Sequence, residues 1–574
     1  NCWGLKNAPC KQGIVQDINR ISYLGFISHL RRIQTPIDSN MKILGINAFH
    51  ADSSACIIID SKIICAIEEE RLTRIKHWAG FPKASITECL KKAKLKIDDL
   101  DFIAVNRNPN AHIFKKISFA INNKPSLKNV ISRIKSRKID MDISRMIADE
   151  FQINKTAIDK KIYNVEHHVA HLASAFYPSG FKDAVVLSVD GFGDFVSTMW
   201  GTANEKSIII DDFVTFPHSL GLFYQALTQY LGFFNYGDEY KVMGMAGYGK
   251  PNYEEEMNQI VSIKDSGKFE LNNKYFLHQS EGVSMEFTDG YPSIGKVFSD
   301  EMIDLLGVHR KSDESIDQKH KDIAASVQLQ FEKSLFNIIA HLGKKYPEKK
   351  QLCMAGGCAQ NSLANGKITN NSSFNEVWVQ PAAGDAGGAL GAAIMAQLDN
   401  FNCSTFSMTS ASLGLSYDND SIAKTISKDI RLNSFTLKSI IDDNDLEDEI
   451  VKNILGGKVI GFFHGGFEWG PRALGNRSII VDPRIDNMKE LLNQKIKKRE
   501  GFRPFAPSVM EDKVHEWFEN NEKVPFMTHV FKIKKEKRSY IPAVTHIDGT
   551  GRLQTVDSLS NKRNYNIISK FFEE

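Results

Sequence analysis

The feature that most constrains the fold of this chain is a strand pattern that occurs twice. In the first copy, β-rich runs at 42–48 and 55–60 flank a small polar turn, and a third run follows at 62–68. The layout returns from residue 184, with a strand ending at Asp190, a glycine turn, a second strand, and a third strand after "TANEKS". Two such units in one chain predict a duplicated α/β domain.

Two glycine-rich loops follow the second copy. A helical pattern over about 315–343 leads to "QLCMAGGCAQNS", in which a predicted strand breaks into Gly356 and Gly357. The segment 381–393, "PAAGDAGGALGAA", places glycines around Asp385 ahead of a small-residue helix. Glycine lets a backbone approach a ligand closely. Either loop alone is more often a simple turn, but together and in this order they are typical of the phosphate and adenosine clamps of the actin-like ATPase fold.

Length and composition narrow the function classes. The 574 residues are too many for one hydrophobic core, so two or three domains are expected. The 42% apolar and 25% charged fractions are ordinary, and a net charge of +3 gives no reason to expect nucleic acid or a membrane surface as a partner. No apolar run has the length of a transmembrane helix or forms a signal-peptide core. The eight cysteines form no paired CxxC motifs, so we expect reduced thiols and a cytoplasmic protein.

Changes in residue composition and pattern divide the chain into three parts. Residues 1–40 are polar and basic and indicate an N-terminal extension, either an arm or an expression remnant. Residues 41–405 contain the duplicated pattern. A polar stretch after about 405 is typical of a linker, and 406–574 indicate a second domain that contains the strand "KVIGFFHG".

Residues 110–160 carry a basic insertion with a helical pattern. A solvated helical face is the favoured interpretation, and a surface for an acidic acceptor or an anionic partner is the alternative. The cations of this insertion are Lys115, Lys116, Lys124, Lys128, Arg133, Lys135, Arg137 and Lys138.

The run "NVEHHVAHLASAF" holds three histidines within five positions. If the run is helical, His167 and His171 share a face, but His168 and His171 could share one as well, so spacing alone leaves the pair open. Two imidazoles one turn apart suit a divalent transition metal with carboxylates supplied from elsewhere. Asp190 and Asp385 lie on the glycine turns where the duplicated fold would place its cleft. Histidines that pair or cap on a buried helix are the alternative.

Cations also gather in the last part of the chain. Forked and point-charge donors of this kind suit a phosphate or a carboxylate. A solvated basic face is the usual explanation for such residues, but aromatic residues lie among these and favour a partly desolvated anion pocket. The cations are Arg472, Arg477, Lys497, Arg503 and Arg552, and the aromatic residues are Trp469, Phe502 and Phe505.

Nine segments in a fixed order span most of residues 41–556. They are "ILGINAFHADSSA", "EEERLTRIKHWAGFP", "EHHVAHLASAFYPSGF", "SVDGFGD", "GDEYKVMGMAGYG", "AGGCAQNS", "AAGDAGGALGAA", "EWGPRALGNRSI" and "KKREGFRPFAPSV". As a set they resemble the O-carbamoyltransferases of antibiotic and toxin biosynthesis, with the tobramycin and cephamycin carbamoylating enzymes and the nodulation carbamoyltransferase as relatives.

This resemblance implies a fold and a reaction. Residues 41–405 should form an actin-like ATPase (ASKHA) domain, similar to that of the enzyme that makes threonylcarbamoyl-adenosine in transfer RNA. Residues 406–574 should form a YrdC-like α/β domain, and because the family continues past this point, that domain is expected to be incomplete at its C-terminus. In the family, the C-terminal domain makes carbamoyl adenylate from carbamoyl phosphate and ATP. The actin-like domain then transfers the carbamoyl group to a hydroxyl of a small-molecule natural product.

The resemblance also implies site residues. The metal ligands would be His167, His171, Asp190 and Asp385, with Fe2+ as the metal and Mg2+ expected with ATP. The carbamoyl-phosphate residues would be Arg472, Lys497, Arg503 and Arg552. The nucleotide contacts would be Glu239, Lys241, Gly356, Gly357 and Asn361. Because the hydroxyl must lose a proton, a base is needed, and the motif favours His50 or Asp52.

Two other functions are weighed against this one. Carbamoylation of transfer RNA or of a protein side chain would use similar domains, but the modest net charge and the lack of paired CxxC zinc fingers argue against it. A non-catalytic actin-like nucleotide-binding module has only the basic insertion in its favour. We expect no membrane partner, we leave a homodimer open, and we expect loops 70–82 and 270–300 to shape the acceptor pocket.

Overall fold

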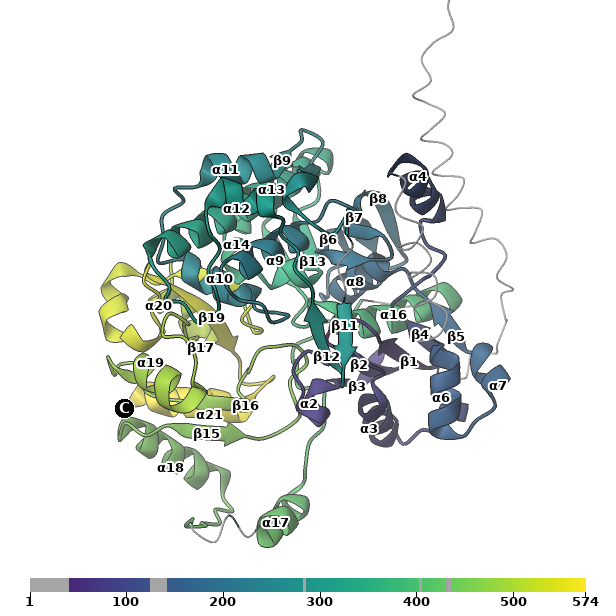
Figure 1. Ribbon diagram of the computed structural model, residues 1–574. Coiled ribbons are helices and arrows are strands. Elements are labelled where there is room, and N and C mark those ends of the chain that lie inside the picture. The colour runs from purple at the N-terminus through teal and green to yellow at the C-terminus, as the bar shows by residue number, and fades with distance from the viewer. Residues whose placement is uncertain (1–40, 124–141, 282–284, 402–404, 430, 432–434) are drawn as a thin grey trace, which may run out of the picture. The chain divides into compact units, whose positions relative to one another are not determined.

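The computed structural model describes residues 41–123, 142–281, 285–401, 405–429, 431 and 435–574 (Figure 1). Residues 41–574 form one compact unit. The predicted extension 1–40 lies outside the described residues. So do six of the eight cations of the basic insertion, namely Lys124, Lys128, Arg133, Lys135, Arg137 and Lys138.

The first copy of the repeated pattern forms a five-stranded sheet in the order β3-β2-β1-β4-β5. Strands β1 and β2, and β2 and β3, pair antiparallel, whereas β1 and β4, and β4 and β5, pair parallel. The strands are β1 (Lys42–Asn47), β2 (Ser54–Ile59), β3 (Lys62–Glu68), β4 (Phe102–Val105) and β5 (Ile162–Asn164).

The second copy builds the same sheet again. Its order, β8-β7-β6-β13-β14, matches the first sheet strand for strand, with the same antiparallel and parallel pairings. The predicted duplication and the actin-like α/β class are therefore confirmed, although the strand predicted to end at Asp190 continues to Gly193 through an irregular register. The strands are β6 (Asp183–Gly193), β7 (Val196–Asn204), β8 (Ser207–Thr215), β13 (Gln351–Ala355) and β14 (Glu376–Val379).

Two helices, α8 (His167–Phe176) and α16 (Asp385–Asn400), pack against each other between the sheets, α16 against the first sheet and α8 against the second. Both helices consist mostly of buried, small or apolar residues. A Cβ at Gly391 would lie 1.7 Å from the Ala170 carbonyl oxygen, so only glycine allows this approach of α16 to α8. This packing brings the first residue of α16, Asp385, beside the first turn of α8.

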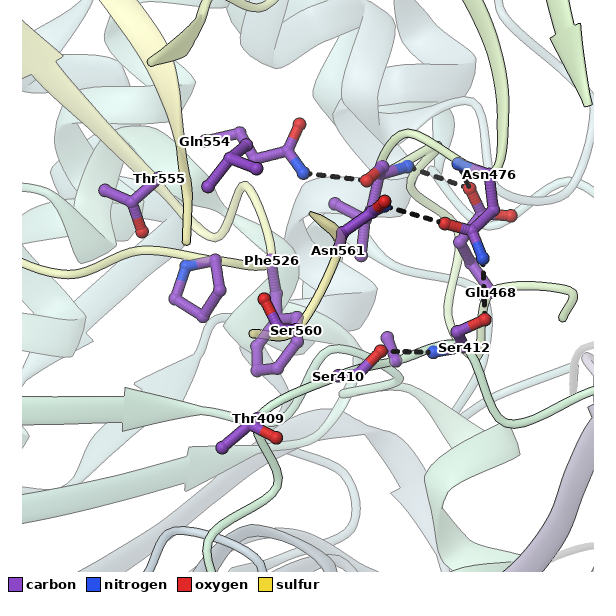
Figure 2. A pocket seen from close by; sticks show the side chains of 14 residues that line it. Thr409, Ser410, Ser412, Glu468, Asn476, Phe526, Gln554, Thr555, Ser560 and Asn561 are labelled. Carbon is purple, nitrogen blue, oxygen red and sulfur yellow. Dashed lines mark hydrogen bonds between the residues drawn. The ribbon is translucent and has the colours of Figure 1, made fainter. Parts of the chain in front are cut away.

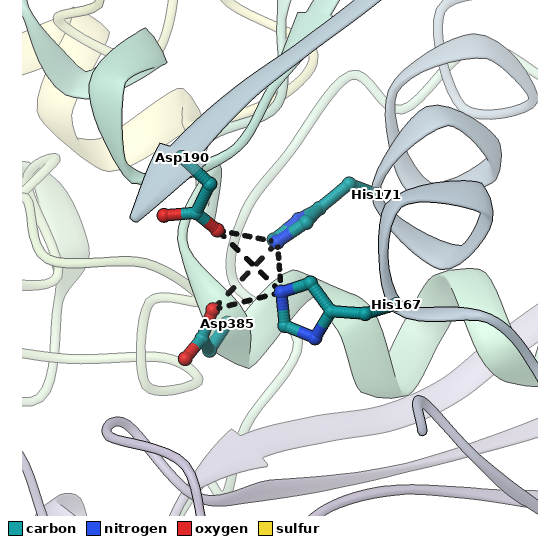
Figure 3. Close-up of side chains that lie close together, drawn as sticks. All are labelled: His167, His171, Asp190 and Asp385. Carbon is teal, nitrogen blue, oxygen red and sulfur yellow. Dashed lines mark hydrogen bonds and ion pairs between the residues drawn. The ribbon is translucent and has the colours of Figure 1, made fainter. Parts of the chain in front are cut away.

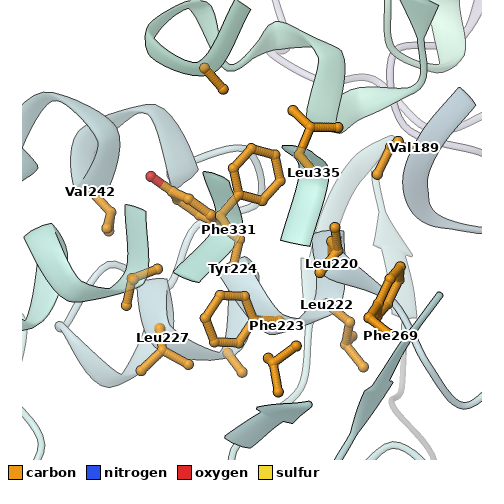
Figure 4. Packing of buried hydrophobic residues seen from close by; sticks show 14 of the residues in the cluster. Val189, Leu220, Leu222, Phe223, Tyr224, Leu227, Val242, Phe269, Phe331 and Leu335 are labelled. Carbon is orange, nitrogen blue, oxygen red and sulfur yellow. The ribbon is translucent and has the colours of Figure 1, made fainter. Parts of the chain in front are cut away.

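A large aromatic core supports the outer face of the second sheet (Figure 4). It includes the fully buried Trp200, Phe223 and Phe331. The helices that enclose it are α9 (Leu220–Tyr230), α10 (Glu239–Ala246), α11 (Glu254–Ile260), α12 (Asp300–Leu306) and α13 (Gln318–Lys345).

Shorter elements complete the actin-like part. Around the first sheet they are α2 (Glu70–Thr73), α3 (Lys83–Ala93), α4 (Ile113–Asn123), α6 (Ile143–Phe151) and α7 (Lys155–Asp159). Elsewhere they are the pair β9 (Val261–Ile263) and β10 (Phe269–Leu271), the hairpin β11 (Met285–Thr288) and β12 (Tyr291–Ile294), and the helices α14 (Ser362–Asn365) and α15 (Ile368–Asn371). No helix among the described residues is both long enough and apolar enough to cross a bilayer.

The last part of the chain is also α/β, as predicted, and its likeness to the YrdC fold remains an expectation. Helix α21 packs on α18 and on the edge strand β17 of a three-stranded sheet ordered β17-β19-β18. The helices are α17 (Asn419–Lys428), α18 (Asp443–Leu455), α19 (Met488–Leu491), α20 (Val514–Trp517) and α21 (Lys562–Glu573). The strands are β15 (Ile460–Phe463), β16 (Arg477–Ile480), β17 (Ser508–Met510), β18 (His529–Lys532) and β19 (Thr550–Val556).

The segment predicted as a linker is packed where it follows residue 405. The Leu413 carbonyl accepts hydrogen bonds from Ala66 N at the edge strand β3 and from Lys92 Nζ. Gly414 N donates to the Phe467 carbonyl at 2.9 Å. This connection therefore joins the first sheet to the C-terminal part, and the domain boundary near 405 stays a prediction.

Candidate functional site

Four side chains from three elements converge between the two sheets (Figure 3). The Nε2 atoms of His167 and His171, one turn apart on α8, lie 3.0 Å from each other. Asp190 Oδ2, on β6, is 2.9 Å from His171 Nε2 and 3.5 Å from His167 Nε2. Asp385 Oδ1, at the start of α16, lies 3.5 Å from His167 Nε2 and 3.6 Å from His171 Nε2. We call these four residues the histidine–aspartate cluster.

The cluster fits a divalent transition metal. One ligand atom of each residue lies within 4.8 Å of the other three. Atoms bound at about 2.1 Å to a common ion lie roughly 3.0 to 3.4 Å from one another, which is close to the separations found here. Two imidazoles and two carboxylates suit first-row divalent ions, Fe2+ among them.

Local sequence fixes two of the three segments that carry the cluster residues, α8 and β6. Glu166 caps α8 by accepting a hydrogen bond from Val169 N at 2.7 Å, so the helix begins at His167. A Cβ at Gly193 would lie 2.0 Å from His167 Cδ2, so the ring needs glycine there. On β6, the Asp190 side chain accepts a hydrogen bond from the next backbone N–H, which directs its other oxygen toward the imidazoles.

The charges of the cluster compensate one another. Burial and the neighbouring Asp190 act to raise the pKa of Asp385, but hydrogen bonds from His167 and His171 outweigh both and hold this pKa below its usual range. Burial acts to lower the pKa of His167, and its bonds to Asp190 and Asp385 raise that pKa well above the ordinary value. Each partly buried carboxylate is thus paired, which offsets the cost of removing it from water.

The remaining histidine of the run is used elsewhere. His168 Nδ1 lies 2.9 Å from Ser188 Oγ, and its Nε2 lies 3.0 Å from the Val196 carbonyl oxygen. Burial lowers the pKa of His168 to about 4. Of the two helical pairs that the spacing left open, the structure brings His167 and His171 to the carboxylates.

The two predicted bases lie in different surroundings. His50 Nδ1 is 3.8 Å from Asp385 Oδ2, and its ring centroid is 5.0 Å from that of His167. Asp52, in a left-handed backbone conformation, instead places Oδ1 2.8 Å from His77 Nδ1. With Glu70, which accepts a hydrogen bond from His77 N, Asp52 and His77 form a second carboxylate–imidazole group. His50 is therefore the predicted base that borders the histidine–aspartate cluster.

Of the predicted nucleotide contacts, the glycine pair lies beside the cluster. Gly356 has a φ of 88°, and a Cβ there would lie 2.2 Å from the Val189 carbonyl oxygen. A Cβ at Gly357 would lie 3.0 Å from Asp190 Oδ1. The backbone of this turn therefore approaches β6 as closely as only glycine permits.

Two of the other three predicted nucleotide contacts, Asn361 and Lys241, already have protein partners. The amide of Asn361 exchanges hydrogen bonds of 2.9 and 3.0 Å with the amide of Gln328. Lys241 Nζ on α10 lies 3.0 Å from Asp238 Oδ1 and 3.3 Å from Glu500 Oε1. Burial raises the pKa of Glu239, the first residue of α10. The contacts of all three with a nucleotide stay predictions.

The four predicted carbamoyl-phosphate residues line one cavity of about 640 Å³ in the C-terminal part. Apolar residues form much of the wall, and α10 of the actin-like part contributes Tyr240 and Met243. Seven cations line this cavity, and two of them, Arg484 and Lys513, pair with Asp482 and Glu516. We call the other five the cation pocket; its members are Arg472, Lys497, Arg499, Arg503 and Arg552.

The cations of this pocket are not compensated as the cluster is. Burial lowers the pKa of Arg472 to about 10. Burial, and then repulsion by Arg472, Arg499 and Arg503, lowers the pKa of Arg552 well below its ordinary value. Within the described part of the chain, Arg503 is the one pocket cation with a carboxylate at ion-pair distance, Glu500 at 3.3 Å. The four arginines are partly buried and Lys497 is exposed, and a group of like charges of this kind favours a bound anion.

Sequence reasoning missed one pocket cation and misjudged another. Arg499 was not predicted, yet it lines the cavity, donates to Asn493 Oδ1 at 2.7 Å, and stacks on Phe505. Arg477 was predicted as an anion donor, but its Nε donates to the buried Glu468 at 2.7 Å. The segment "KKREGFRPF" shows that cations gather here, but their spacing does not tell which side chains line the cavity.

A small polar pocket joins the connecting segment to the C-terminal part (Figure 2). Asn476 Nδ2 donates to Ser412 Oγ at 2.6 Å, and Asn476 Oδ1 accepts from Asn561 Nδ2 at 2.9 Å. Glu468 accepts hydrogen bonds from the backbone around Asn476. The volume of about 30 Å³ is room for about one water, so this pocket is a structural joint.

Comparison with family models finds two matches. A model described as "Carbamoyltransferase N-terminus" matches residues 42–394, and one described as "Carbamoyltransferase C-terminus" matches residues 451–574.

Individual proteins show the same similarity. The nodulation protein NolNO of Sinorhizobium fredii is 34% identical over 92% of this chain and 72% of its own length. An uncharacterized protein of Synechocystis is 35% identical over 92% of this chain and 88% of its own length. The crystal structure of T. kodakarensis HypF aligns over 63% of this chain and 48% of that one, at 13% identity and a TM-score of 0.30.

Proposed function

The chain belongs to the carbamoyltransferase family, and on that premise we propose that it is an ATP-dependent O-carbamoyltransferase acting on a small-molecule hydroxyl. One observation carries the proposal. The same compact unit holds an uncompensated cation pocket and a separate, charge-balanced histidine–aspartate cluster that fits a metal. A reaction in two stages needs two such places.

The first stage is assigned to the cation pocket. We propose that Arg472, Lys497, Arg503 and Arg552 bind the phosphate of carbamoyl phosphate. The uncompensated charge of the pocket supports this role, because forked guanidinium donors suit phosphate oxygens. Carbamoyl phosphate and water would give carbamate and phosphate, and carbamate would attack the α-phosphate of ATP to give carbamoyl adenylate and pyrophosphate. Mg2+ would accompany ATP.

The second stage is assigned to the actin-like part. An aliphatic hydroxyl is a poor nucleophile, so the carbamoyl group needs a good leaving group, and AMP is one. His167, His171, Asp190 and Asp385 would hold a divalent metal, Fe2+ by resemblance. When bound, such an ion supplies electrostatic stabilisation of the charge that develops on the leaving phosphate. The approach of the glycine turn 356–357 to Asp190 supports placing the adenylate beside this cluster.

We propose His50 as the group that accepts the proton of the acceptor hydroxyl. Its ring lies next to the cluster, whereas Asp52 is directed toward His77. General base catalysis needs a group within hydrogen-bond reach of the hydroxyl, and of the two predicted bases His50 is the one beside the cluster where we propose that transfer occurs.

The acceptor would enter between two loops that the sequence analysis singled out. Ala79 N donates to the Gly290 carbonyl at 2.9 Å, and the Trp78 ring occupies the space that a Cβ at Gly290 would need. Loop 70–82 therefore contacts the β11–β12 hairpin, which supports a pocket formed jointly by loops 70–82 and 270–300. The acceptor we propose is a hydroxylated natural product.

The test uses the full chain with ATP, carbamoyl phosphate and a divalent metal. We expect pyrophosphate from the first stage, and AMP together with a carbamoylated product once an acceptor is supplied. A panel of hydroxylated metabolites, followed by mass spectrometry, identifies the acceptor class. Failure to release pyrophosphate with Fe2+, Mn2+, Zn2+ or Mg2+ would contradict the proposed function.

A further inference from the structure

One carboxylate lies between the two candidate anion-binding regions. Glu500 Oε1 is 3.3 Å from Lys241 Nζ, and Glu500 Oε2 is 3.3 Å from Arg503 Nη1. Lys241 belongs to α10 of the actin-like part, and Arg503 belongs to the cation pocket. Each oxygen of Glu500 thus serves a cation from a different region.

Each of the two cations also has a contact other than Glu500. The Arg503 guanidinium stacks on the Tyr240 ring at 4.5 Å from its centroid. Lys241 has a second carboxylate, Asp238 Oδ1, at 3.0 Å. Loss of the Glu500 charge would therefore leave both cations in position but less neutralised.

Glu500 is also placed to move. Its side chain is 30% exposed, and a Cβ at the next residue, Gly501, would meet nothing within 4 Å apart from its chain neighbours. The attraction of a carboxylate for a cation at this exposure is modest, so a phosphate dianion bound at the same cation can displace it.

We propose, resting on the carbamoyl-phosphate role proposed for Arg503 and the nucleotide contact predicted for Lys241, that Glu500 is a counter-ion shared by the carbamoyl-phosphate site and the nucleotide site. An anion that binds Arg503 frees Glu500 to neutralise Lys241. An anion that binds near Lys241 frees Glu500 to neutralise Arg503. The two sites therefore bind their anions with negative coupling, and linkage requires the same factor in both directions.

This coupling suits a reaction in two stages. With carbamoyl phosphate in the cation pocket, Lys241 holds a phosphate less tightly, which favours release of spent AMP from the actin-like part. Once the pocket is empty, Glu500 again pairs with Arg503, so that Lys241 is less neutralised and can bind the phosphate of the next adenylate. Glu500 is in this sense a positioning residue that touches neither reacting group.

The test measures the affinity of inorganic phosphate by calorimetry, with and without saturating AMP, in the full chain and in Glu500→Gln. In the wild type we expect AMP to weaken phosphate binding roughly five-fold. In E500Q we expect this dependence to disappear and phosphate to bind about two- to five-fold more tightly than in the wild type. The matched control is Glu490→Gln, an exposed carboxylate whose Oε1 accepts a hydrogen bond from Gln494; it should behave as the wild type.

Each other outcome overturns the inference in a recognisable way. Antagonism that persists in E500Q means that phosphate and AMP compete directly for one site. Weaker phosphate binding in E500Q means that Glu500 supports the pocket structurally. Additive binding in the wild type removes the coupling but leaves the proposed function intact, whereas no binding of phosphate or of AMP overturns both.

Discussion

The histidine–aspartate cluster and the cation pocket both bury charge, but they differ in how that charge is balanced. In the cluster, two carboxylates face two imidazoles at 2.9 to 3.6 Å. The carboxylates raise the pKa of His167 and the imidazoles lower the pKa of Asp385, so that both shifts favour the charged forms. In the pocket, burial and mutual repulsion act together to lower the pKa of Arg552. The cluster is compensated before any ligand arrives, and the pocket is not.

This difference distinguishes a site whose geometry is held without a ligand from a site that a bound anion stabilises. A compensated cluster holds its geometry in the unliganded protein, which suits a place that keeps an ion through many turnovers. A group of like charges favours whichever state brings in an anion, which suits a place that binds and releases a substrate in every cycle. The predictions below test whether the two regions behave in these opposite ways.

The largest effect is expected in the cation pocket. Arg472→Ala and Arg552→Ala should each reduce carbamoyl-phosphate-dependent pyrophosphate release by at least about 100-fold, because a buried guanidinium contact with phosphate is lost. The release is measured with a coupled pyrophosphate assay. Arg145→Ala, which removes an exposed arginine from α6, is the control and should retain full activity. Normal release in both pocket variants would show that these arginines do not bind the phosphate.

A different loss is expected in the cluster. His167→Ala and Asp190→Ala should lose bound metal and at least about 100-fold of acceptor carbamoylation, while retaining pyrophosphate release. Metal content by mass spectrometry and the two activities are measured on the same preparations. His168→Ala is a demanding control, since this buried histidine belongs to the same helix but not to the cluster; it should keep the metal. If the cluster variants lost pyrophosphate release together with the metal, the cluster would be needed for both stages, which contradicts the proposed division.

Stability should change in opposite directions in the two regions. Asp190→Asn breaks a buried charge pair and should lower the free energy of unfolding by roughly 3 kcal/mol. Arg552→Met removes a partly buried cation that has no carboxylate partner among the described residues and should raise it by about 1 kcal/mol. Both are read from urea denaturation of the metal-free protein without added anion. If both changes destabilised the protein equally, the charge of Arg552 would contribute to stability in the unliganded protein, which contradicts the description of the pocket as uncompensated.

The smallest effect is expected when inorganic phosphate is added to the otherwise unliganded protein. Inorganic phosphate should raise the midpoint of thermal unfolding of the wild type by a few degrees, because a ligand that binds only the folded state stabilises it. The shift should be absent in Arg552→Ala and unchanged in His168→Ala. An equal shift in the arginine variant would place phosphate binding elsewhere on the protein.

The repeated strands could be predicted from the sequence because their signal is local. A short β-rich run bounded by polar turn residues predicts a strand without reference to distant parts of the chain, and the runs near 42, 55 and 62 form β1, β2 and β3 almost to the residue. The pairing of His167 with His171 needed more, since His168 satisfies the same spacing rule. Only the positions of Ser188 and Val196, which occupy the nitrogens of His168, decide between them.

The cation pocket shows where sequence reasoning ends. Arg477 and Arg499 carry the same side chain in similarly basic segments, yet one pairs with the buried Glu468 and the other lines the cavity. That difference depends on which chain segments the fold brings alongside. The position of Glu500 between Lys241 and Arg503 has the same origin, because those two cations come from parts of the chain about 260 residues apart.

The division of labour between the two regions is the central claim, and one rescue experiment tests it most directly. Chemically prepared carbamoyl adenylate is supplied, with acceptor, to Arg472→Ala, Arg552→Ala, His167→Ala and Asp190→Ala of the full chain. Because the arginines act before the adenylate exists and the cluster acts after it, transfer should be restored in both arginine variants and in neither cluster variant. Restoration in the cluster variants without restoration in the arginine variants would show that the two roles belong to the opposite regions.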